Sequence, residues 1–146
     1  MKKLLSILML GLFSFIFAGN PIKDLAKAKE MAKAEHKLIL LKFSDSDWCV
    51  PCIRLQKQII DTEQFMIFSD KNLVLMDADF PRLKKNKLPK DEQEKNEALA
   101  EKFNKDGIFP KLILMDSSGK VLTHWDGFNN WSPQTLIDNI KPYLEK

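Results

Sequence analysis

The spacing of apolar residues changes several times along the chain, and each change predicts the boundary of an element. From Pro21 to Lys37, apolar residues recur at three- and four-residue steps with Lys and Glu between them, which predicts an amphipathic helix. The runs 38–43 (LILLKF) and 73–78 (LVLMDA) are short and almost continuously apolar, which predicts two buried strands. Between these strands the pattern predicts a helix from near Cys49 to Ile60 and a further helical turn over 62–70.

The second half of the chain interrupts this pattern and then resumes it. Residues 80–90 contain two prolines and five basic residues, which predicts an irregular segment before a polar helix over 91–105. Strands over 112–115 and 120–125 form a predicted hairpin, and Ser132 is placed to cap a last helix. A βαβ half followed by a ββα half predicts an α/β fold with helices on both faces of a central mixed β-sheet.

The N-terminus has the character of a targeting segment. Two lysines precede an uncharged 15-residue run from Leu4 to Ala18. This length fits the apolar part of a secretory signal and falls short of the roughly 20 residues that span a bilayer. We therefore expect a signal peptide over residues 1–19, followed by one domain over 20–146. An uncleaved membrane anchor is the alternative.

Composition excludes several classes of protein. The chain has 146 residues, of which 45% are hydrophobic and 29% charged, which is typical of one globular domain. The net charge of +3 is too small to indicate the basic face that binds nucleic acid. Two cysteines are too few for a disulfide-rich secreted scaffold.

The two cysteines, Cys49 and Cys52, lie three positions apart where the first strand gives way to a helix. Unpaired N–H groups and the helix dipole at this junction stabilise a thiolate, so Cys49 is the candidate nucleophile. Cys52, one turn further along, is expected to be buried and to resolve a mixed disulfide. Pro51 between them is tolerated in a first helical turn.

The cysteine pair has two alternative roles. Half of a zinc site would need two further ligands, and the spacing of His36 and His124 fits no ligand pair. A purely structural disulfide would close a ring of four residues and constrain the unfolded chain little. We therefore favour a redox-active pair, with no metal and no cofactor.

The segment Trp48–Cys52 (WCVPC) resembles the active site of the thioredoxin family, and the similarity extends over nearly all of residues 20–146. The loop 43–49 and the segment from 80–83 through 96–100 are similar to those of exported bacterial members, and Gly107–Pro110 resembles the cis-proline loop of the family. The resemblance implies a thioredoxin-like three-layer fold. It also implies a thiol–disulfide oxidoreductase of the periplasm.

The resemblance also implies a substrate-binding surface beside the cysteines. Pro110 is expected to be cis and to pack against them, whereas an ordinary trans proline at a strand start is the alternative. Phe109 would pair its backbone with the substrate, and Gly127 would border the same groove. The expected substrate-binding residues are Trp48, Val50, Pro51, Phe109, Pro110 and Gly127.

One residue departs from the family pattern. Lys42 stands where many thioredoxins carry a buried Asp that helps to deprotonate the second cysteine. Lys42 could stabilise a thiolate by Coulomb attraction, lose its charge through burial, or extend to the surface. Asp45 and Asp47 are the other candidates for proton transfer, so the sequence leaves the proton route open.

The direction of catalysis is inferred from the residues between the cysteines. The two residues between the cysteines are Val50 and Pro51, whereas strongly oxidising relatives carry a His there that stabilises the thiolate. The absence of this His favours a protein-disulfide reductase. An oxidase or isomerase using the same cysteines is the alternative, and a thioredoxin-shaped adaptor is a second one. We expect a monomer that acts on disulfide-bearing exported proteins and receives electrons from a membrane thiol-transfer protein.

Two further groups of residues have two interpretations each. The basic run from Arg82 to Lys90 could dock an acidic partner or anionic lipid, or could simply be a solvated face. The aromatic residues Trp125, Phe128 and Trp131 are expected to pack near the last hairpin rather than to form a binding site.

Overall fold

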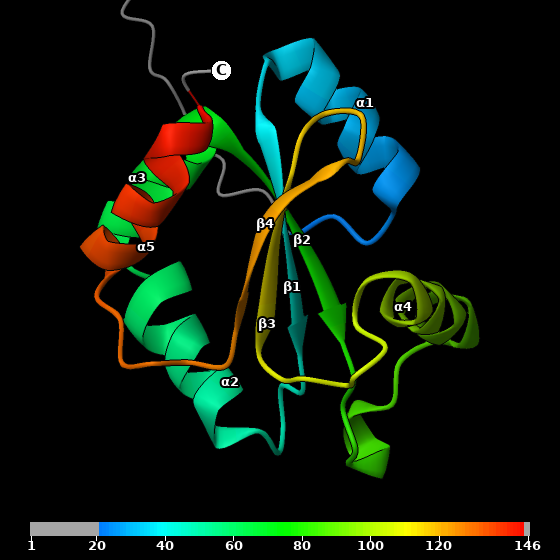
Figure 1. Ribbon diagram of the computed structural model, residues 1–146. Coiled ribbons are helices and arrows are strands. Elements are labelled where there is room, and N and C mark those ends of the chain that lie inside the picture. The colour runs from blue at the N-terminus through cyan, green and yellow to red at the C-terminus, as the bar shows by residue number, and fades with distance from the viewer. Residues whose placement is uncertain (1–20, 145–146) are drawn as a thin grey trace, which may run out of the picture.

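The computed structural model describes residues 21–144 (Figure 1). The predicted signal peptide over 1–19 lies outside the described residues. The helices are α1 (Leu25–Glu35), α2 (Val50–Leu55), α3 (Glu63–Asn72), α4 (Lys90–Phe103) and α5 (Pro133–Ile140). The strands are β1 (Leu38–Ser44), β2 (Leu73–Asp79), β3 (Lys111–Met115) and β4 (Val121–Asp126). Single turns are the π-type η1 (Gln56–Ile60) and the 3₁₀ turns η2 (Lys84–Asn86) and η3 (Lys141–Tyr143).

The four strands form one mixed sheet in the order β2-β1-β3-β4. β1 and β2 run parallel, whereas the β1–β3 and β3–β4 pairs are antiparallel. The predicted βαβ and ββα halves therefore join at the centre of the sheet. In this register Lys42 lies directly opposite Asp77 on β2 and Leu112 on β3.

Each outer edge of the sheet has an irregular feature. At the β2 edge, the Ile22 N–H donates to the Leu75 carbonyl at 2.9 Å, and the Ile22 carbonyl accepts the Asp77 N–H at 3.4 Å. Toward the β4 edge, the pairing with β3 shifts register between Leu114 and Met115. The first feature extends the sheet by a single bridge, and the second interrupts a ladder.

The sheet separates two apolar cores. Figure 1 shows α1 and α4 on one face, and α2, α3 and α5 on the other. Alternate residues of a strand point to opposite faces, so Ile39, Leu41 and Phe43 pack in the first core, whereas Leu40 packs in the second. This arrangement confirms the predicted three-layer architecture.

The helix expected over 21–37 spans only Leu25–Glu35, and Ile22 pairs with β2 instead. The two helices between β1 and β2 also differ from the expected boundaries. The helix predicted as far as Ile60 ends at Leu55 and continues as the π-type turn η1. The helical turn expected over 62–70 is the full helix α3. Its N-terminus is capped by the Thr62 hydroxyl, which accepts the Phe65 N–H at 3.3 Å, and Phe65 is fully buried.

The aromatic cluster after β4 has a packing role. Trp125 and Trp131 meet edge to face with ring centroids 6.4 Å apart, and both contact the core that α5 covers. Phe128 packs against the same core. The interpretation of these residues as packing residues is therefore confirmed.

Candidate active site

The two cysteines form a disulfide at the N-terminus of α2. Cys49 is the N-cap residue, and its Sγ accepts the Cys52 N–H at 3.3 Å. The helix start thus directs a backbone donor and the positive end of the dipole at this sulfur, as the sequence predicted. Cys49 is 8% exposed and Cys52 2% exposed, so Cys52 is the more shielded of the two.

A groove of 630 Å³ lies beside Cys49. The residues that line it are Asp45, Trp48, Cys49, Val50, Pro51, Arg82, Gly107 and Phe109. Trp48 is 62% exposed and Val50 56%, so both side chains are open to solvent beside the disulfide. Exposed apolar side chains next to a disulfide suit contact with another polypeptide.

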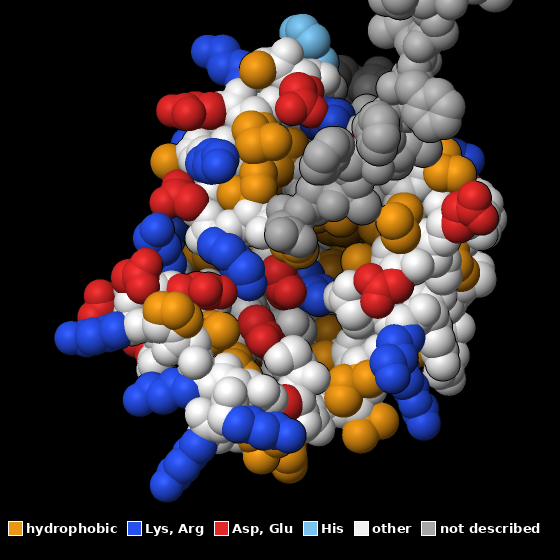
Figure 2. Space-filling model, turned by 180° about the vertical axis from the view of Figure 1, so that it is seen from behind, with side chains coloured by type: hydrophobic (Ala, Val, Ile, Leu, Met, Phe, Trp, Pro, Cys, Tyr) orange, Lys and Arg blue, Asp and Glu red, His pale blue; other side chains and the backbone are white. Residues whose placement is uncertain are grey.

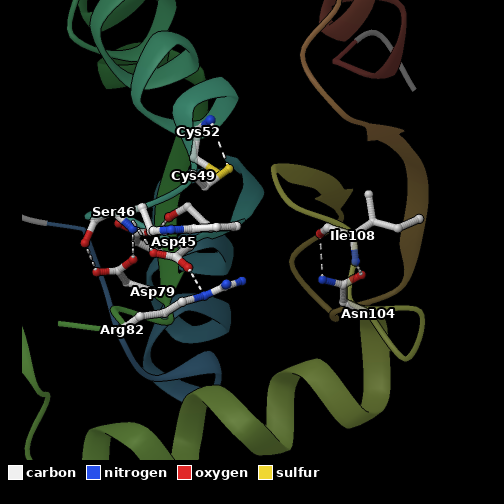
Figure 3. The surroundings of a disulfide bond; sticks show 11 residues. Asp45, Ser46, Cys49, Cys52, Asp79, Arg82, Asn104 and Ile108 are labelled. Atoms are coloured by element: carbon white, nitrogen blue, oxygen red, sulfur yellow. Dashed lines mark hydrogen bonds and ion pairs between the residues drawn. A yellow bond between two sulfur atoms is a disulfide. The ribbon is translucent and has the colours of Figure 1, made fainter.

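The loop opposite the disulfide is held in place from within. The Phe109–Pro110 peptide bond is cis. Asn104 is buried and makes two hydrogen bonds with the backbone of Ile108, donating to its carbonyl at 2.9 Å and accepting its N–H at 3.0 Å (Figure 3). The Gly127 N–H donates to the Pro110 carbonyl at 2.8 Å, so Gly127 supports this loop.

Arg82 forms part of the groove wall, a role that the sequence did not indicate. Figure 3 shows Arg82 reaching Asp45 from the segment that follows β2. The Arg82 Nε lies 2.8 Å from the buried Asp45 carboxylate, and its guanidinium lies 3.9 Å from the centroid of the Trp48 ring. The same carboxylate accepts the Trp48 N–H at 3.2 Å. Asp45 therefore fixes both members of a cation–π contact.

Asp47 anchors the segment that carries Arg82. Its carboxylate accepts the backbone N–H groups of Arg82 and Leu83 and the side-chain amide of Asn86, each at 3.0 Å. The hydrogen bond from Asn86, followed by those from the two backbone groups, holds the pKa of Asp47 below its ordinary value, and partial desolvation opposes this shift. Asp45 and Asp47 are thus both engaged in fixing the active-site loop to residues 82–86.

A second, smaller cavity of 260 Å³ lies behind Cys52. Lys42 and Asp77 both line it, with Nζ and Oδ2 3.4 Å apart. The Lys42 side chain is only 12% exposed and also donates to Gln56, so the idea that Lys42 extends to the surface is wrong. The Ser44 hydroxyl donates to Asp77 at 3.2 Å. Sequence reasoning singled out Lys42 here but missed Asp77.

The surface over α4 carries mixed charge. Figure 2 shows Lys and Arg side chains interspersed with Asp and Glu side chains over α4 and the segment after β2.

Within residues 21–144, no helix is long and apolar enough to cross a membrane. In the same range, no group of three or more His, Cys, Asp or Glu residues is placed to hold a metal ion.

Comparison with known proteins agrees with this geometry. A family described as thioredoxin-like matches residues 20–117. The chain is 35% identical over 120 residues to the disulfide bond reductase DsbH of Chlamydia pneumoniae, an alignment that covers 82% of this chain and 70% of that protein.

Solved structures give the same result. A structure described as DsbH oxidoreductase superposes with a TM-score of 0.75 at 34% identity, covering 88% of this chain and 87% of that one. A disulphide isomerase of Xylella fastidiosa Temecula1 has a TM-score of 0.61 at 19% identity, covering 89% and 95%, and shows likeness of fold alone. With its cysteine pair at the start of α2, this chain belongs to the thioredoxin-like family and is a thiol–disulfide oxidoreductase.

Proposed function

We propose that the protein is a periplasmic protein-disulfide reductase in which Cys49 is the nucleophile and Cys52 the resolving cysteine. The observation that carries this proposal is the asymmetry of the pair. Cys49 caps a helix and borders a groove with exposed apolar walls, whereas Cys52 is shielded. The similarity to a protein named as a disulfide bond reductase, and the lack of His between the cysteines, support the reducing direction.

The proposed reaction transfers two electrons in two exchange steps. The Cys49 thiolate attacks one sulfur of the substrate disulfide, forming a mixed disulfide and releasing the other substrate sulfur as a thiolate that takes a proton. The Cys52 thiolate then attacks the Cys49 Sγ. This step forms the Cys49–Cys52 disulfide, breaks the bond to the substrate and releases its second thiol.

The proposed substrate site is the groove beside Cys49. Trp48, Val50 and Pro51 give it one wall, and Phe109 and Pro110 belong to the loop on the opposite side. An extended substrate segment would lie between them and pair with the backbone of Phe109. Gly127 contributes indirectly, by supporting Pro110.

The proposed partners follow from the direction of electron flow. Each turnover leaves the protein oxidised, so a dithiol donor must restore the Cys49 and Cys52 thiols. We propose a membrane thiol-transfer protein as this donor and disulfide-bearing exported proteins as substrates. The apolar run from Leu4 to Ala18 supports export. Recovery from a periplasmic fraction, with a mass that corresponds to cleavage near Gly19, tests this location.

The reduction potential of the Cys49–Cys52 pair tests the direction. The purified domain would be equilibrated in glutathione or dithiothreitol buffers and its thiols trapped by alkylation. We expect a value near that of thioredoxin, about −270 mV. A value near about −120 mV, typical of a strongly oxidising exported enzyme, would make the protein a disulfide donor instead.

A further inference from the structure

The cavity behind Cys52 is polar at a place where the sheet is otherwise apolar. Leu40 and Leu114 belong to the apolar core on this face of the sheet. Toward the end of β1 and β2 nearest Cys52, the positions on this face are instead Lys42, Ser44 and Asp77. A volume of 260 Å³ has room for several water molecules, at about 30 Å³ each.

The Lys42–Asp77 pair is poorly explained by stability alone. The two residues are direct cross-strand neighbours, and their side chains are 12% and 19% exposed. Removing two charges from water carries a desolvation penalty that the attraction between them often fails to exceed. A charged pair beside a shielded cysteine is therefore better explained by a role in chemistry at that cysteine.

The other polar groups of the cavity lead from this pair to the solvent. Gln56 accepts from Lys42 and donates to Asp61 at 2.7 Å. Asp61 and Lys57 are exposed and line the same cavity. The charged groups that line the cavity with Cys52 are thus Lys42 and Asp77 from the sheet, Lys57 from η1, and Asp61 just after η1.

We propose that Asp77 exchanges the Cys52 proton across this cavity, and that Lys42 is a positioning residue that holds the carboxylate and stabilises negative charge beside the sulfur. The carboxylate would come from β2, because β1 carries Lys42 where many thioredoxins carry Asp. This inference rests on the proposed roles of the two cysteines.

The proposed step balances within the second exchange. The Cys52 thiol gives its proton to Asp77, and the resulting thiolate attacks Cys49 Sγ. The Cys49–Cys52 bond forms as the bond to the substrate breaks, and the electron pair of that bond leaves with the substrate sulfur. When a dithiol donor later reduces the disulfide, Asp77 returns the proton to Cys52.

A chromogenic aromatic disulfide separates this step from the first one. The reduced protein releases one coloured thiolate when Cys49 attacks the reagent, and a second when Cys52 resolves the mixed disulfide. Stopped-flow measurement of both phases from pH 5 to 10 gives a rate profile for each cysteine. Loss of the first phase would contradict the proposed function, whereas the proposed role of Asp77 affects the second phase alone.

We expect Asp77→Asn to slow the second phase about tenfold at neutral pH, because the thiol loses its internal proton acceptor. The deficit should close at high pH, where hydroxide takes the proton, and Asp77→Glu should restore most of the rate. The first phase should change by less than about twofold. A second phase with the wild-type pH profile in Asp77→Asn would overturn the proposal.

The chain supplies a matched control for the ion pair. Lys111 and Asp126 are also a cross-strand pair, 3.3 Å apart, and Lys111 lies on the face of the sheet opposite Lys42. Asp126→Asn should leave both phases unchanged.

A double variant guards against the destabilising effect of one unpaired charge. Lys42→Gln combined with Asp77→Asn removes both charges and leaves neither partner alone. We expect the double variant to fold and to remain slow in the second phase. Recovery of the wild-type rate in the double variant would show that the pair is structural only.

Discussion

The two sulfur atoms of this disulfide face different surroundings. Cys49 borders a groove of 630 Å³ whose walls include exposed aromatic and aliphatic side chains, whereas Cys52 backs onto a cavity of 260 Å³ that contains an ion pair. The first surface suits contact with a polypeptide, and the second suits movement of a proton. The comparison teaches that one short helix start can separate recognition from proton exchange, because its two bonded cysteines border different cavities.

The largest effect on turnover is expected when each cysteine sulfur is removed in turn. Cys49→Ser should lower turnover of a disulfide-bonded protein at least about a thousandfold, because the nucleophile is lost. Cys52→Ser should also stop turnover but should accumulate a mixed disulfide through Cys49, since nothing resolves it. Non-reducing electrophoresis and mass spectrometry distinguish the two variants.

The same variants test the adaptor alternative. If Cys49→Ser instead traps the substrate and Cys52→Ser does not, the assignment of the two cysteines is reversed. If a variant with both substitutions keeps full biological activity, the protein acts by binding alone and needs neither thiol.

A smaller effect is expected from the groove wall. Arg82→Ala removes the guanidinium over Trp48 and should raise KM for a protein disulfide about two- to fivefold, in line with an exposed cation–π contact. Turnover of a small aromatic disulfide should not change, because such a reagent needs little of the wall. Arg54→Ala on α2 is the matched control. An equal rise in KM in this variant would show that Arg82 has no specific role in the groove wall.

The smallest effect concerns the anchor of the active-site loop. Asp47→Asn weakens the bonds to residues 82–86 and should lower Tm by a few degrees at neutral pH. Since folding lowers the pKa of Asp47, its contribution to stability is present above the ordinary carboxyl value of about 3.9 and is lost as pH falls through the lower folded value.

Thermal unfolding of wild type and Asp47→Asn across pH measures this contribution. The difference in Tm should be constant above about pH 5 and should shrink below about pH 3.9. A difference that persists unchanged in strong acid would mean that the Asp47 charge does not hold the loop.

The sequence was sufficient for features that depend on local pattern. Cys49 and Cys52 lie three positions apart between an apolar run and a helix, and all the residues that form this pattern are neighbours in the sequence. The disulfide, the start of a helix at Cys49 and the order of the elements along the chain could therefore be predicted. The full length of α3 could not be predicted, because its burial does not follow residue type: Met66 and Ile67 are exposed, whereas Ser69 is buried.

Asp77 and Arg82 were missed for a related reason. Asp77 lies inside an apolar run, and its pairing with Lys42 depends on the register of β1 against β2, which residues far apart in the chain determine. Arg82 lies in a basic run, and its position over Trp48 depends on the way Asp47 folds the segment back. Neither of these two contacts can be predicted from the spacing of residues along the sequence.

The irregular sheet edges described above bear on how the protein behaves at high concentration. A free strand edge is a template onto which another extended chain can add, and such addition begins amyloid-like aggregation. The bridge at Ile22 occupies part of the β2 edge, and the register shift at Leu114 and Met115 distorts the ladder next to β4. A bridge that occupies an edge and a bulge that twists one both make a strand a poorer template, so these two features disfavour the addition of another extended chain.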